Sequence, residues 1–149
     1  MNQIIHINCE LSCDHRQAFK EFTDNQLLES WLCVKANVIA EQGGAYELFW
    51  QPEKPEINST LGCCMTAVQP QQLLSFEWRS PVQFKDFANQ ADPLTHVTVS
   101  FFPKKDTTIV HLIHSGWRKT EEWEAARQWQ LNAWKMAFST LQKKYTPQT

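Results

Sequence analysis

The feature that most constrains the fold is the order of the hydrophobic patterns: short alternating segments come first, and one long helix comes last. Residues 120–144 have the 3.6-residue period of an amphipathic helix, with Thr120 placed as its N-cap. The stripe that this helix presents to a core consists of Trp123, Arg127, Gln130, Leu131, Trp134, Phe138 and Leu141. An aromatic stripe of this length needs a broad apolar surface to pack against, and a sheet provides one.

The segments before this helix alternate apolar and polar residues, as half-buried strands do. Two short helices, around residues 18–22 and 27–32, follow the first strand. The predicted strands cover residues 5–11, 34–39, 46–50, 60–68, 73–79, 95–102 and 107–115. Because successive strands are joined by turns, the sheet is expected to be antiparallel. The sequence therefore predicts an α+β fold, β-α-α-β6-α, with a curved antiparallel sheet wrapped on a long C-terminal helix.

Composition excludes several classes of function. The chain of 149 residues is expected to form a single domain, residues 1–149. Its net charge of −2 lacks the basic excess of a nucleic-acid binder, and no apolar run is long enough to span a membrane. Its four glycines cannot form a dinucleotide-binding or phosphate-binding loop. We therefore expect a cytoplasmic protein with no cofactor and with no nucleic-acid or membrane partner.

The five cysteines are odd in number, contain one adjacent pair and form no CxxC motif. This pattern predicts reduced thiols rather than a disulfide framework. His6, Cys9, Cys13 and His15 lie close enough in sequence to raise the question of a zinc site. Strand alternation places His6 and Cys9 on opposite faces, whereas zinc needs converging ligands. We predict no metal site.

Two polar side chains are expected among the inward-facing apolar residues. His114 shares the inner face of its predicted strand with Val110 and Leu112. It is interpreted either as a hydrogen-bonding group or general base for a ligand or, preferentially, as a core histidine that holds the following loop. Arg127 can bind a ligand carboxylate or pair with Glu124.

These patterns predict a pocket of roughly several hundred Å³ between the long helix and the sheet. The candidate ligand-binding residues are Trp31, Tyr46, Phe76, Trp78, Val99, Leu112, His114, Trp123, Arg127 and Trp134. For each tryptophan, core packing is the alternative. The ten candidate residues do not supply a matched acid and base or an activated nucleophile, so we predict no catalytic residue.

A second apolar stripe on the long helix is turned away from the first and consists of Ala126, Trp129, Ala133 and Met136. We expect Trp129 and Met136 to be exposed. Residues 80–93 form a long connection that carries Phe84 and Phe87. We predict that this segment folds over the helix as a lid. A symmetric dimer that covers the same stripe is the alternative.

Motifs spread over nearly the whole chain resemble one known family. They are Ala18-Phe19 with Phe22-Thr23-Asp24 and Trp31; Gly43-Gly44-Ala45-Tyr46; Gly62, Pro70, Leu74, Phe76 and Trp78; Thr108 to Trp117, ending His114-Ser115-Gly116-Trp117; and Trp134 with Leu141. In this order they resemble the START-like (SRPBCC) helix-grip superfamily and, within it, the Activator of Hsp90 ATPase homologue-like family. The resemblance implies a seven-stranded grip fold around a hydrophobic cavity, with no shared catalytic motif.

The leading interpretation is a domain that encloses a small hydrophobic or aromatic ligand. The resemblance implies an alternative, a protein-interaction module of the Hsp90 ATPase activator type, with a chaperone or a second copy as partner. A co-chaperone of that type has a further N-terminal domain, whereas this sequence starts at its first predicted strand, so the alternative ranks second. A cyclase- or hydrolase-like enzyme, as among some START-like relatives, ranks third.

Overall fold

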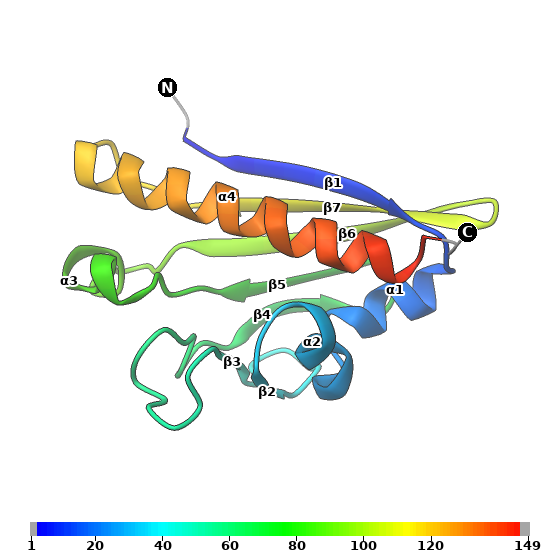
Figure 1. Cartoon of the computed structure of the whole chain (residues 1–149), viewed down its shortest axis with the longest axis horizontal. Helices are drawn as coiled ribbons and strands as arrows, with labels where there is room; N and C mark the ends of the chain where they lie inside the picture. The colour runs from blue at the N-terminus through cyan, green and yellow to red at the C-terminus, as the bar shows by residue number, and fades with distance from the viewer. Residues whose placement is uncertain (1–2, 147–149) are drawn as a thin grey trace.

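The elements of the computed structural model, which describes residues 3–146, follow the predicted order. They are β1 (Ile5–Leu11), α1 (His15–Glu21), α2 (Asn25–Trp31), β2 (Lys35–Val38), β3 (Tyr46–Phe49), β4 (Met65–Gln69), β5 (Leu73–Glu77), the 3-10 helix η1 (Val82–Phe84), α3 (Lys85–Ala88), β6 (His96–Lys104), β7 (Thr107–Ser115) and α4 (Glu121–Lys144). Five strands form an antiparallel sheet in the order β1-β7-β6-β5-β4. Helix α4 runs across one face of this sheet (Figure 1), which confirms the predicted helix-grip fold.

The sheet is smaller than predicted because β2 and β3 form a separate two-stranded ribbon. Residues 60–64, predicted as part of a strand, contain a turn instead. The Thr60 hydroxyl accepts a hydrogen bond from the Leu48 backbone N–H and donates one to the Tyr46 carbonyl, at 2.8 and 2.9 Å. A side chain thus takes part in the pairing beside β3. The two sheets are joined by isolated bridges and by single backbone bonds, such as that from the Tyr46 N–H to the Cys63 carbonyl.

Helix α4 begins where the sequence predicts. Thr120 is its N-cap and accepts a hydrogen bond from the Trp123 backbone N–H at 3.2 Å. Its buried residues are Trp123, Ala126, Gln130, Trp134, Phe138 and Leu141. The stripe that faces the core therefore differs from the predicted one at three positions: Arg127 and Leu131 are only partly buried, and Ala126 is buried although it was not predicted there.

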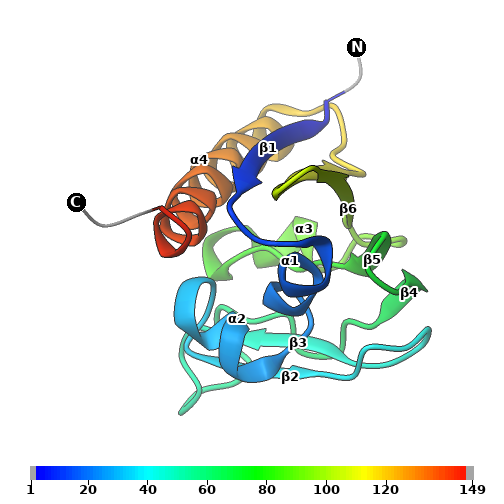
Figure 2. The same ribbon diagram turned by 90° about the vertical axis from the view of Figure 1, so that its right-hand side faces the viewer.

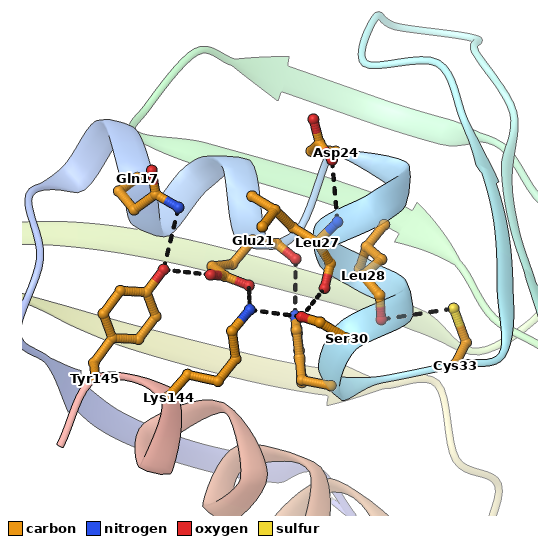
Figure 3. Close-up of polar contacts among 10 residues, drawn as sticks. Gln17, Glu21, Asp24, Leu27, Leu28, Ser30, Cys33, Lys144 and Tyr145 are labelled. Carbon is orange, nitrogen blue, oxygen red and sulfur yellow. Dashed lines mark hydrogen bonds and ion pairs between the residues drawn. The ribbon is translucent and has the colours of Figure 1, made fainter. Parts of the chain in front are cut away.

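The C-terminal end of α4 is fixed to the two N-terminal helices by a buried carboxylate (Figure 3). Glu21, at the end of α1, is 1% exposed and accepts a hydrogen bond from Lys144 Nζ at 2.6 Å. Tyr145 donates its hydroxyl proton to the same carboxylate. Burial and this bond raise the pKa of the Tyr145 phenol. Lys144 Nζ also donates to Ser30 Oγ of α2 at 2.6 Å, so this cluster joins the end of α4 to both helices. Figure 2 shows α1 and α2 between this end of α4 and the β2–β3 ribbon.

The segment of residues 80–93, predicted as a loop, contains η1 and α3. The Asn89 side chain joins the two ends of this segment by hydrogen bonds to the Ser80 backbone. Its Oδ1 accepts from the Ser80 backbone N–H at 2.6 Å, and its Nδ2 donates to the Ser80 carbonyl at 2.8 Å. These two bonds give a short irregular segment a fixed shape that hydrophobic periodicity does not reveal.

This segment packs on α4, as predicted for a lid. Phe84 meets Trp129 edge to face with ring centroids 6.3 Å apart, and Phe87 meets Trp123 at 5.3 Å. Trp129 remains 42% exposed and Met136 73% exposed, so these two residues face outward as predicted and the segment does not cover them fully. Ala126, predicted on the same outward stripe, is instead buried.

Candidate functional site

A pocket of about 360 Å³ lies beside α4, and several separate parts of the chain form its walls. Helix α4 contributes Trp129, Gln130, Ala133 and Trp134. The chain just after β5 contributes Trp78 and Arg79, and the remaining wall includes Trp50, just after β3. The pocket thus lies toward one side of the helix, and the segment of residues 80–93 supplies Pro81 and Gln83 at its edge.

Four tryptophans are among the residues that line the pocket: Trp50, Trp78, Trp129 and Trp134. Trp78 lies between two other indoles, with its centroid 4.9 Å from that of Trp134 and 5.9 Å from that of Trp50. Trp78 and Trp134 are 3% and 1% exposed, so only a small part of each ring remains open. Such surfaces favour flat apolar molecules, which can stack on the rings or meet them edge to face.

The indole N–H groups of Trp50, Trp78 and Trp134 already have partners in the protein. Trp50 Nε1 donates to the Leu32 carbonyl at 2.8 Å, and Trp134 Nε1 donates to His114 Nδ1 at 3.1 Å. Trp78 Nε1 donates to Gln130 Oε1 at 3.2 Å. These bonds fix the ring positions and leave apolar ring surface, rather than N–H groups, for a bound molecule.

His114 supports this wall from behind and does not line the pocket. Since an indole nitrogen can only donate, His114 Nδ1 must be the acceptor, and the neutral ring carries its proton on Nε2, which lies 3.0 Å from Thr95 Oγ1. Complete burial, with a smaller contribution from His96, lowers the pKa of His114 to about 3. Its geometry is that of the core histidine preferred in the sequence analysis.

Two of the ten predicted site residues, Trp78 and Trp134, line the pocket. The other aromatic and aliphatic candidates are buried core residues: Trp31, Tyr46, Phe76, Val99, Leu112 and Trp123. Rings fill the space between helix and sheet: Phe22 lies between Phe138 of α4 and Phe101 of β6, with centroids 6.2 and 5.6 Å apart. The open space is therefore displaced to the side of α4.

Arg127, the remaining candidate, is held by a neighbour on its own helix. Its Nη2 and Nε lie 2.6 and 2.9 Å from the two carboxylate oxygens of Glu124. The hydrogen bonds from Arg127, followed by the one from Gln128, lower the pKa of Glu124 to about 2. Arg127 thus forms the pairing given as the alternative and does not line the pocket.

The pocket includes residues that sequence reasoning did not select: Trp50, Arg79, Trp129, Gln130 and Ala133. One signal was present, because Gln130 is an uncharged polar residue within a stripe of mostly apolar residues. Arg79 is the only ionisable side chain among the described residues of the pocket wall. Its Nε and Nη1 donate to the carbonyls of Leu61 and Asn89 at 2.9 and 3.2 Å, which anchor it there.

Other chemistries find little support in the described part of the chain. Within residues 3–146, no three His, Cys, Asp or Glu side chains gather as a metal site would require. All five cysteines are free, and burial raises the pKa of Cys9, Cys33 and Cys63 to about 12. Thiols of this kind are poor nucleophiles. No helix of residues 3–146 is long and apolar enough to cross a membrane.

Comparison with known proteins gives one family. Residues 12–143 match the family model described as Activator of Hsp90 ATPase homolog 1-like protein. No curated protein matches the sequence.

Several solved structures share the fold. A Mesorhizobium loti protein has a TM-score of 0.74 at 20% identity, with 94% of each chain covered. An HSP90 activator from Plasmodium falciparum has a TM-score of 0.69 at 20% identity, with 93% of this chain and 92% of that chain covered. The Aha1 dimer from Colwellia psychrerythraea has a TM-score of 0.72 at 13% identity, with 95% of each chain covered.

Proposed function

The chain belongs to the Activator of Hsp90 ATPase homolog 1-like family, as its motifs predicted, and we propose that it binds a small, flat, apolar or aromatic molecule in the pocket beside α4. The observation that carries this proposal is the chemistry of the pocket wall. Three tryptophans, Trp50, Trp78 and Trp134, present ring surface there while their N–H groups are bonded inside the protein. A ligand therefore gains apolar contact without breaking a hydrogen bond of the wall.

The volume and position of the pocket support the same function. About 360 Å³ lies within the range of small-molecule sites, and the wall is built from buried, mutually packed rings. Preformed walls keep the entropic cost of binding low, because few side chains need to be ordered when the ligand enters.

The proposal is tested by filling the pocket. Ala133 lies on α4 in the pocket wall, so Ala133→Phe places a phenyl ring in the space that a ligand would occupy. Ala125 is exposed on the same helix, and Ala125→Phe is the matched control. Isothermal titration calorimetry with the flat hydrocarbon 2-isopropenylnaphthalene should show binding to wild type and to the control.

We expect the affinity of Ala133→Phe to be at least about tenfold lower, because the apolar contacts and the space are both lost. Equal affinity of wild type and Ala133→Phe, or no binding to wild type, would contradict the proposal.

The second candidate function is a protein-interaction module of the chaperone-activator type. It is favoured by the family and by the description of one similar structure as an HSP90 activator. The test is the ATPase rate of purified Hsp90 with and without this protein. An increased rate that Ala133→Phe leaves unchanged would favour this function over ligand binding, and an unchanged rate with no detectable complex would refute it.

A further inference from the structure

The orientation of one buried amide limits the chemistry of the ligand. Gln130 is 4% exposed, lies on the inner face of α4 and lines the pocket. Its Oε1 is 3.2 Å from Trp78 Nε1. Because an indole nitrogen has a proton and no lone pair to offer, the partner facing Trp78 must be the amide oxygen. Trp78 therefore decides which way the Gln130 amide is turned.

The NH₂ group of Gln130 then faces away from Trp78. Among the described residues, none accepts a hydrogen bond from Nε2, and the only bond of this side chain is the one at its oxygen. The same part of the chain contains no fully buried side-chain nitrogen or oxygen that lacks a partner. Nε2 must therefore reach open space, and the open space beside Gln130 is the pocket.

A donor in this position distinguishes between ligands. A pure hydrocarbon that covers the NH₂ group leaves it desolvated and unpaired, which is costly. A ligand with an acceptor oxygen at that point replaces the lost water with a hydrogen bond. The charge of the wall also favours a ligand with an acceptor oxygen, because Arg79 is cationic and the described wall contains no carboxylate.

We propose that the ligand is an aromatic molecule whose ring system carries an acceptor oxygen, as in an aryl ketone or an aryl carboxylate, and that Gln130 Nε2 donates a hydrogen bond to this oxygen. This inference rests on the proposed function, since it concerns the ligand of the same pocket. It names Gln130 as a specificity-determining residue and the rings of Trp78 and Trp134 as the apolar surface.

The test compares two probes that differ at one position. In 2-acetonaphthone the side chain is C(=O)CH₃, and in 2-isopropenylnaphthalene a CH₂ group replaces the oxygen. Wild type should bind the ketone about tenfold more tightly than the hydrocarbon, which is the ratio that one well-placed hydrogen bond supplies. Gln130→Met removes the donor and keeps a weak acceptor sulfur for Trp78, so the ratio should fall to about one.

Gln128→Met makes the same exchange at an exposed position of α4 and should keep the tenfold ratio. The carbonyl stretch of bound 2-acetonaphthone gives a second measurement on wild type alone, which does not depend on the folding of Gln130→Met. We expect it at lower frequency than in hexane, as for a hydrogen-bonded ketone.

Equal affinity of wild type for the two probes, with a stretch as in hexane, would overturn the inference and leave the proposed function standing. Failure of both probes to bind wild type would overturn both.

Discussion

Acidification is expected to destabilise this protein through His114, and the effect is large enough to measure. The ring is fully buried, and Trp134 Nε1 and Thr95 Oγ1 occupy its two nitrogens. A second proton would have to displace the indole N–H at Nδ1 and would create a buried charge. This is why the pKa of His114 is lowered from 6.5 to about 3.

The direction of the effect follows from proton binding in the two states. Between pH 6.5 and about 3 the unfolded chain binds a proton at His114 and the folded protein does not. Protonation therefore favours unfolding in this window, and the stability contributed by the neutral ring is complete only above pH 6.5. Each pH unit below 6.5 costs about 1.4 kcal/mol, so lowering the pH to 5 should remove about 2 kcal/mol from the free energy of unfolding.

The assay is urea unfolding followed by circular dichroism at pH 7.5 and pH 5. His114→Gln is less stable at both values, but its loss of stability between them should be about 2 kcal/mol smaller than that of wild type. His15→Gln, in the first turn of α1, shows whether removal of any histidine changes the pH dependence. If wild type and His114→Gln lose the same free energy between the two pH values, the assignment of a buried neutral ring is refuted.

Three further predictions concern the rest of the fold. Glu21→Ala should lower the free energy of unfolding by about 2 kcal/mol in urea, because it removes the carboxylate that accepts hydrogen bonds from Lys144 and Tyr145; an unchanged midpoint would contradict this. Trp129→Ala should lower stability by about 1 kcal/mol at an unchanged hydrodynamic mass, because Phe84 loses its partner ring. A halved mass would instead indicate the dimer, and no change in either quantity would refute both interpretations. Dithiothreitol should leave the melting temperature unchanged, and a shift of several degrees would reveal a disulfide.

Local chemistry made much of the fold predictable from the sequence. Hydrophobic periodicity located the strands and helices, and Thr120 marked the start of α4. The alternation of residues along a strand placed His114 on an inner face. The outward position of Trp129 and Met136 also followed from helical period alone. Each of these features depends on residues close to one another in the chain, which is why one sequence suffices to predict them.

Features that depend on distant partners could not be predicted in this way. The sheet divides because the Thr60 hydroxyl takes backbone partners on β3, and periodicity carries no sign of that choice. The pocket lies beside α4 because Phe22, Phe101 and Phe138 fill the space between the helix and the sheet. The role of Gln130 depends on Trp78, which is far away in sequence and fixes the amide orientation only after folding.

The most direct test of a ligand pocket beside α4 is native mass spectrometry of the protein and of Ala133→Phe, each produced in the source organism without added ligand. Our account predicts that wild type carries a reproducible bound small molecule with aromatic absorbance and that Ala133→Phe carries none. The same bound mass on both proteins, or no bound mass on wild type, would contradict it.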